Sequence, residues 1–200
     1  MDIFRKKYSR FSDEELMRLI RISDIHAFDE IYRRYSKRIL HYFYRMLGES
    51  ENKAQDFLQD LFLKIVEKPE RFDSSKKFST WIFAIAYNQC KNEYRRLGVR
   101  QAYARERSRE NSDFLHQSES PVEKELDRKS LRQSLIRELT KYDPGTRHVF
   151  LLRLQENMSI REISEITGYK EGTVKSKLFY ITRKLAENLK EYHPLYKEVK

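Results

Sequence analysis

Apolar residues in the first half of the chain recur every three or four positions, the spacing of amphipathic helices. This pattern predicts three longer helices, at about 26–47, 51–67 and 78–96. A shorter helix precedes them, because Ser12 and Glu15 have the spacing of a capping box. Gly48 and Pro69 follow two of the periodic runs and are typical helix-ending residues. We expect these helices to form one N-terminal domain over residues 1–97.

The periodic pattern stops between residues 98 and 122, where the chain is polar and large apolar residues are sparse. Such composition is typical of a linker, either flexible or only locally helical. We expect a second helical domain over 123–190, in which Asp143 caps a helix with Pro144 at its first position. We expect residues 191–200 to form a C-terminal tail outside both domains.

The second domain contains the pattern of a helix-turn-helix. Ser159 and Glu162 form another capping box, and Gly168 would close the short helix that follows. A longer helix at 173–189 carries an apolar stripe: Val174, Leu178, Ile181 and Leu185. An ordinary helical hairpin would show a similar layout. The run Gly-Thr-Val-Lys-Ser-Lys at the start of the second helix favours DNA binding, with that helix in a major groove.

Composition agrees with an all-α protein of two small helical domains. The 200 residues include only five glycines and four prolines. The formal net charge of +10 favours a polyanionic partner without choosing between nucleic acid and an acidic membrane. The single cysteine, Cys90, excludes an internal disulfide and a zinc site built on a cysteine cluster. Because we find neither a signal peptide nor a run of about 20 apolar residues, we expect a cytoplasmic protein.

The helix at 78–96 carries the most specific chemistry. One of its sides is apolar and suits a core: Ile82, Ala86, Cys90 and Leu97. Another side combines a ring, amides and cations without a carboxylate: Trp81, Ala84, Asn88, Lys91, Asn92 and Arg95. Cations suit phosphates, amides suit base edges and a flat ring suits stacking on a base. Alternatively, Trp81 is a core residue and the cations are a solvated stripe. The basic helix near the C-terminus favours nucleic-acid binding.

Three separate motifs, in this order and spacing, resemble the extracytoplasmic-function (ECF) sigma factors of bacterial RNA polymerase. The first is the run 54–64, similar to the helix that binds core polymerase. The second, Phe-Ser-Thr-Trp-Ile at 78–82 with 85–88 and Arg95-Arg96, resembles the helix that melts and reads the −10 element. The third comprises 147–153, 160–163 and 172–177, and resembles the domain that reads the −35 element.

The resemblance implies roles for individual residues. Docking on the β′ clamp helices of core polymerase is implied for Asp56, Gln59, Asp60, Phe62 and Leu63, although Phe62 and Leu63 also fit a packing role. Contacts to the −10 region are implied for Lys76, Lys77, Trp81, Asn88, Lys91, Asn92, Arg95 and Arg96. Contacts to the −35 element are implied for Arg161, Lys170, Glu171, Thr173, Lys175, Ser176 and Lys177.

The implied partners are promoter DNA, core polymerase through its β′ clamp helices and β flap, and an anti-sigma factor. We expect no cofactor, no metal and no enzymatic activity. Two alternatives stay open at this point: a stand-alone helix-turn-helix activator with an N-terminal sensor or partner-binding domain, and an enzyme acting on nucleic acid. The second basic face in the N-terminal domain favours the sigma factor over the activator. The five scattered histidines and the lack of a catalytic motif argue against the enzyme.

Overall fold

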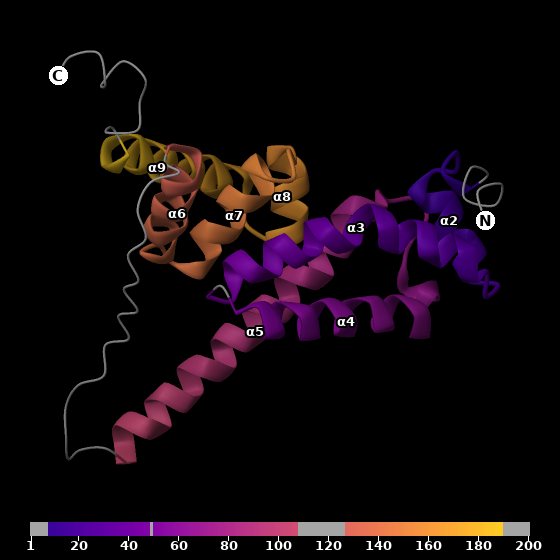
Figure 1. Ribbon diagram of the computed structural model, residues 1–200, viewed down its shortest axis with the longest axis horizontal. Helices are drawn as coiled ribbons and strands as arrows, with labels where there is room; N and C mark the ends of the chain where they lie inside the picture. The colour runs from indigo at the N-terminus through magenta and orange to yellow at the C-terminus, as the bar shows by residue number, and fades with distance from the viewer. Residues whose placement is uncertain (1–7, 49, 108–126, 190–200) are drawn as a thin grey trace.

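The computed structural model describes residues 8–48, 50–107 and 127–189, and all regular elements in these segments are helical. The all-α prediction is confirmed. Figure 1 labels the helices α2 (Asp13–Ile20), α3 (Ile25–Met46), α4 (Glu51–Glu67), α5 (Phe78–Arg107), α6 (Asp127–Thr140), α7 (Pro144–Leu154), α8 (Ile160–Thr167) and α9 (Glu171–Asn188). A short 3-10 helix, η1 (Pro69–Arg71), follows α4.

Helix α3 is the centre of the N-terminal domain, because α2, α4 and α5 all pack against it. The ends of the helices follow the sequence signals. Ser12 and Glu15 form the predicted capping box at the start of α2. Asp24 caps α3 by accepting hydrogen bonds from the backbone N–H groups of His26 and Ala27. Since these caps satisfy N–H groups that a helix leaves unpaired, each stabilises its helix by about 1 kcal/mol.

Helix α5 is longer than the sequence pattern predicts. The expected boundary lay near residue 97, with a linker from 98, whereas the helix continues through Arg107. Residues 98–107 contain one glycine and no proline, and Ala, Arg, Gln and Glu in this stretch have high helix propensity. A helix therefore needs no apolar stripe to persist here. In Figure 1 this end of α5 projects away from the other helices. Most of the remaining predicted linker, residues 108–122, lies outside the described residues.

The C-terminal domain is built by α7, α8 and α9, which pack on one another, with α6 against α9. Asp143 caps α7 as predicted, because its side chain accepts a hydrogen bond from the Thr146 N–H at 2.9 Å. Gly168 ends α8 at φ 74°, the left-handed conformation that glycine adopts without steric cost. Helix α9 begins at Glu171, two residues before the expected start. Residues 123–126, where this domain was expected to begin, lie outside the described residues.

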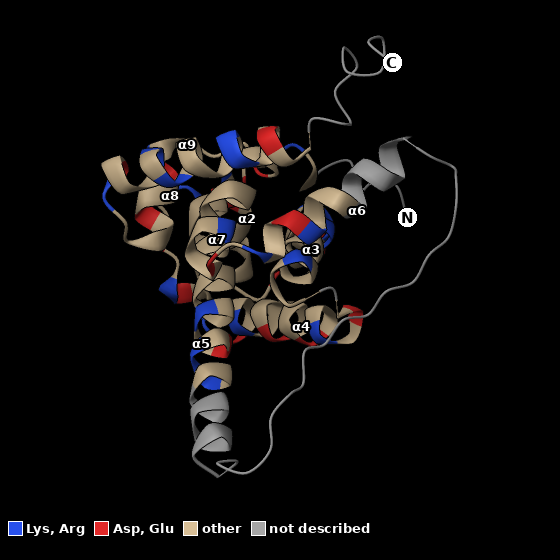
Figure 2. Ribbon diagram, turned by 90° about the vertical axis from the view of Figure 1, so that its left-hand side faces the viewer, with Lys and Arg blue, Asp and Glu red and all other residues tan. Residues whose placement is uncertain are grey.

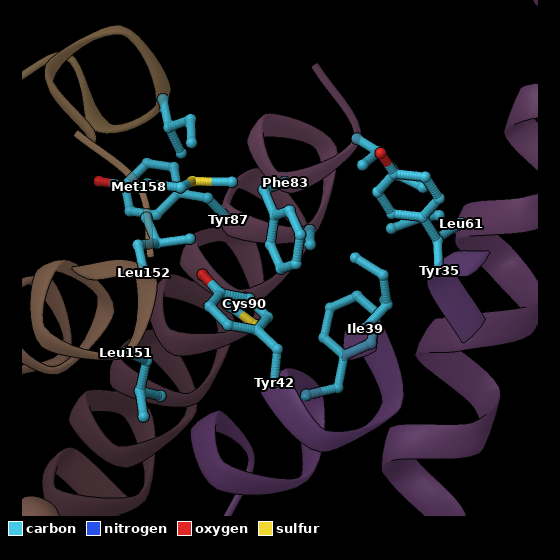
Figure 3. Packing of buried hydrophobic residues seen from close by; sticks show 14 of the residues in the cluster. Tyr35, Ile39, Tyr42, Leu61, Phe83, Tyr87, Cys90, Leu151, Leu152 and Met158 are labelled. Carbon is cyan, nitrogen blue, oxygen red and sulfur yellow. The ribbon is translucent and has the colours of Figure 1, made fainter. Parts of the chain in front are cut away.

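The two domains pack against each other. Helix α5 lies beside α8, and both α3 and α5 contact α7. Their buried apolar side chains belong to one continuous cluster. Figure 3 shows Tyr42 and Cys90 of the N-terminal domain close to Leu151 and Leu152 of α7, with Met158 near Tyr87. The sequence did not predict how the two domains are placed relative to each other, whereas the structure shows them in direct contact.

Candidate nucleic-acid interface

The outer face of α5 exposes five polar side chains at helical spacing: Asn88, Lys91, Asn92, Arg95 and Arg96. We call this set the α5 face. The opposite side of the helix is buried, as predicted, through Ile82, Ala86 and Cys90. Figure 2 shows the Lys and Arg segments along the middle of α5. Because its five side chains are exposed, the α5 face is accessible to a ligand.

Local contacts orient several side chains of the α5 face. The Lys91 Nζ lies 6.0 Å from the centroid of the Tyr87 ring. The Arg96 guanidinium pairs with the Glu93 carboxylate at 2.8 Å, and Glu93 is itself buried. Arg95 donates a long hydrogen bond of 3.4 Å to the Asn92 side-chain oxygen. These contacts leave both amides and all three cations accessible.

Trp81 lies at the other end of this helix and is half-buried. Its ring packs against those of Phe72 and Phe78, with centroids 5.2 and 5.7 Å away. These contacts hold the indole in one position beside the loop at 73–77. In that loop Lys76 is exposed, whereas the Lys77 Nζ pairs with a carboxylate oxygen of Glu162 in α8 at 2.8 Å.

The start of α9 presents a second polar surface. We call the exposed residues there the α9 tip: Lys170, Glu171, Thr173, Lys175 and Ser176. Lys170 is the N-cap residue but makes no side-chain capping bond, so the first N–H groups of α9 keep their capacity to bind an anion. Arg161 on α8 is exposed as well and pairs with Glu165 at 3.3 Å.

Lys177 differs from the other candidates on α9. Its side chain is only 24% exposed, and its Nζ donates to the Thr146 hydroxyl at 2.8 Å. The same ammonium lies 5.4 Å from the centroid of the Tyr169 ring. The structure therefore places Lys177 at the contact between α7 and α9, away from the α9 tip.

The polymerase-binding candidates on α4 also divide into two groups. Asp56, Gln59, Asp60 and Leu63 are exposed on the outer side of the helix, and we call them the α4 face. Phe62 is only 4% exposed. Its ring lies 4.7 Å from the Tyr32 ring and 6.0 Å from the Phe28 ring, centroid to centroid. Phe62 thus joins α4 to α3.

The sequence analysis did not predict that Arg147 and His148, two polar residues of α7, are both buried. The Arg147 guanidinium donates to the backbone carbonyls of Leu139, Thr140 and Tyr142, and to the Tyr94 hydroxyl at 3.3 Å. The neighbouring His148 is 1% exposed. Burial, with a smaller contribution from Arg147, lowers the pKa of His148 to about 3. The signal in the sequence is an Arg-His pair directly before the apolar run 149–152.

Nothing in the described residues suggests a metal site, since no group of three or more His, Cys, Asp or Glu side chains there could hold an ion. Burial raises the pKa of the Cys90 thiol, which keeps this side chain a packing residue. Over the same segments, no helix is long and apolar enough to cross a membrane.

Comparison with known families accounts for both domains. Residues 31–100 match the family described as Sigma-70 region 2, and residues 132–185 match Sigma-70 region 4. The chain is 28% identical over 163 residues to the RNA polymerase sigma factor YlaC of Bacillus subtilis, covering 82% of this chain and 92% of YlaC. It is 27% identical over 181 residues to the ECF RNA polymerase sigma factor SigW of the same species, covering 86% and 94%.

Solved structures show the same fold. The chain resembles CnrH in its complex with the cytosolic domain of CnrY, with a TM-score of 0.65 and 21% identity over 89% of this chain and 97% of that one. It also resembles the sigma factor RpoE of Bartonella quintana in complex with the anti-sigma factor NepR, with a TM-score of 0.62 and 21% identity over 82% and 96%.

Two helical domains, each with an exposed surface suited to DNA, and each matching a sigma region in the same order, define an RNA polymerase sigma factor. More narrowly, the chain belongs to the extracytoplasmic-function group of the sigma-70 family. It is a DNA-binding regulator that directs promoter-specific transcription, which decides against the stand-alone activator.

Proposed function

We propose that the α5 face reads and opens the −10 element. The observation that carries this assignment is that five amides and cations are exposed together while the other side of α5 is buried. Lys91, Arg95 and Arg96 would neutralise phosphates, and Asn88 and Asn92 would bond to base edges. The loop that contains Lys76 and Lys77 lies at the same end of the helix as Trp81.

Capture of unpaired bases provides the energy for opening. Stacking one base on an aromatic ring contributes about 1–3 kcal/mol, and unstacking a step costs a few kcal/mol. One or two captured bases therefore shift the local balance toward the open duplex. The packed rings of Phe72 and Phe78 hold Trp81 in place, so little side-chain entropy is lost when a strand binds. The mechanism proposed here uses no enzymatic step.

The α9 tip is proposed to read the −35 element from the major groove. Thr173 and Ser176 would face base edges, while Lys170 and Lys175 would contact phosphates beside the positive end of the α9 dipole. Glu171 would accept from a cytosine amino group, the pairing that a carboxylate makes in this groove. Arg161 would contact the backbone from α8. Lys177 would hold α9 on α7.

Protein partners follow from the exposed surface of α4 and from the comparisons. The α4 face would dock on the β′ clamp helices of core polymerase, with Leu63 as its apolar contact and the C-terminal domain on the β flap. CnrH and the Bartonella RpoE were solved with protein partners, CnrY and NepR, and we propose that an anti-sigma factor likewise controls this chain. Its place of action would be the cytoplasm, where core polymerase works.

The decisive experiment is run-off transcription with purified core polymerase and a library of native promoters. We expect initiation only when the chain is added. On a responsive promoter, Asn88→Ala should reduce permanganate reactivity of the −10 thymines several-fold while initial binding changes less. Asn188→Ala, the same substitution at the end of α9, serves as the control and should match the wild type. A footprint of Asn88→Ala equal to that of the control would contradict the role of the α5 face.

A further inference from the structure

The contact between the two domains is rich in polar pairs. Arg38 of α3 pairs with Glu156 at 2.7 Å, and Arg45 donates to the Gln155 side-chain oxygen at 3.1 Å. At the start of α5, the Lys77 ammonium meets the Glu162 carboxylate. Further along α5, the Tyr94 hydroxyl accepts from Arg147. The Tyr42 hydroxyl lies 2.5 Å from Nδ1 of His148. The same contact also buries apolar side chains, among them Leu151 and Leu152. The polar pairs in it can exchange for water when the domains separate.

We call the arrangement with both domains packed together the closed form. If the α5 face and the α9 tip bind DNA as proposed above, the closed form cannot contact both promoter elements at once. Positions −35 and −10 are separated by about 25 base pairs, or roughly 85 Å of duplex at about 3.4 Å per pair. Helices α5 and α8 lie side by side. In addition, Glu162 already neutralises Lys77, a candidate for the −10 contact. The domains must therefore separate before the chain can occupy a promoter.

His148 is buried at the middle of this contact. Its ring faces Tyr42 of α3 and the aromatic residues Tyr87 and Tyr94 of α5, with centroids 5.6, 4.7 and 6.5 Å away. The Tyr42 hydroxyl can bond only one ring nitrogen, and Nε2 is buried without a hydrogen-bond partner. Such a site accepts a neutral imidazole and has no acceptor for a second N–H.

The charged groups around His148 reinforce this preference. Arg147 on the same helix is positively charged and lowers the pKa of His148, because it repels a protonated imidazole. Asp143, just before α7, raises that pKa by a smaller amount. Titratable groups close to His148 and Tyr42 also include the phenols of Tyr87 and Tyr94, the Cys90 thiol on α5 and the Glu156 carboxylate, which is paired with Arg38. His41 lies on the same side of α3 as Arg38 and Arg45 by helical spacing, and is half-buried.

We propose that His148 is a pH-sensitive latch, which holds the two domains together while its imidazole is neutral and releases them when it is protonated. Release would expose the imidazole to water and free Lys77 and the α8 side of α5. The closed chain would thus be a stored form, and a fall in cytoplasmic pH would favour the separated form that a promoter requires.

The direction of the pH effect follows from linkage. In the open form His148 has an ordinary pKa of about 6.5, whereas in the closed form its pKa is about 3. The closed form is therefore fully favoured above about pH 6.5 and loses that advantage as the pH falls toward 3. Between pH 7.5 and 5.5 the ratio of open to closed chain should rise about ten-fold. The Glu162 carboxylate, with a pKa of about 2, stays ionised throughout this window.

The test is energy transfer in the free full-length chain between dyes at Lys64→Cys on α4 and Ala186→Cys on α9, two exposed positions outside the proposed surfaces. We expect transfer to fall between pH 7.5 and 5.5, with the open-to-closed ratio rising about ten-fold. His148→Gln cannot be protonated and should show no pH dependence. His26→Gln is the control and should behave as the wild type, because His26 is exposed at the start of α3 and its Nδ1 lies 3.8 Å from the Asp29 carboxylate of the same helix.

Two results would overturn the latch: an unchanged distance in the wild type over this range, or an equal pH response in His148→Gln. Because His148→Gln also changes the contact with Tyr42 at every pH, the ring of His148 is titrated by NMR in the wild type as well. We expect an apparent pKa below about 6.5 that tracks the loss of energy transfer. Titration near 6.5 while the domains stay closed would contradict the proposal. Neither the energy-transfer measurement nor the NMR titration contains polymerase or DNA. Both therefore test the latch even if the proposed function is wrong.

Discussion

Neighbouring side chains on α4 illustrate how sharply the role of a residue depends on its direction. Phe62 is 4% exposed, while Leu63, the next residue, is 56% exposed. Both are apolar, and the sequence motif includes both among the polymerase-binding candidates. The structure gives Phe62 a packing role against Tyr32 and Phe28. More than half of Leu63 stays exposed, beside exposed Asp60.

The two residues should therefore respond differently to truncation. Phe62→Ala should lower the free energy of unfolding by about 3–5 kcal/mol, because it removes a buried ring and leaves a cavity. Leu63→Ala should leave the free energy of unfolding within about 0.5 kcal/mol of the wild type and weaken binding to core polymerase. Urea unfolding and a core-binding titration separate the two effects. If Leu63→Ala destabilised the chain as much as Phe62→Ala, Leu63 would be a packing residue and not part of the α4 face.

At the scale of single elements, local sequence signals account for most helix ends. The capping boxes at Ser12 and Ser159 form as predicted, and so does the left-handed end of α8 at Gly168. These signals succeed because a cap involves only residues three or four apart. The end of α5 was placed too early because its last turns lack an apolar stripe, while helix propensity alone extends the helix to Arg107.

The conformation of Gly168 leads to a test within the helix-turn-helix. Gly168→Ala should destabilise the C-terminal domain by about 1–2 kcal/mol, since an L-residue is strained at φ 74° even though the added methyl group meets open space. Gly172→Ala, in the first turn of α9, has similar open space without positive φ. That change should stabilise the domain by up to about 1 kcal/mol. Equal losses from both substitutions in thermal unfolding would contradict the strain argument.

On the scale of the whole molecule, the arrangement of the domains depends on contacts between distant parts of the chain. Glu156 is an example, because its side chain is 1% exposed and its charge is balanced by Arg38, which lies on the other domain. A buried charge that loses its partner is costly, whereas the same carboxylate in an open chain is hydrated. The Arg38–Glu156 pair should therefore favour closure.

Arg38→Ala tests this dependence directly. We expect lower energy transfer between dyes at Lys64→Cys and Ala186→Cys at pH 7.5, corresponding to a several-fold rise in the open fraction, with helix content unchanged by circular dichroism. Arg33→Ala is the matched control, since Arg33 is on the same helix and pairs with Glu30 within the N-terminal domain. An Arg33→Ala chain that opens as far as Arg38→Ala would show that closure does not depend on the interdomain pair.

The sequence by itself determined the helical class, the main caps, the helix-turn-helix and the exposed side of α5, because each depends on residues within a few turns of one another. Only the tertiary structure decided that Lys77 meets Glu162, 85 positions away, and that Tyr42 meets His148, 106 positions away. It also decided that Lys177 turns toward Thr146 while Lys175 stays exposed. Helical periodicity assigns a side to each residue, but the neighbour on that side depends on how helices distant in the chain pack together.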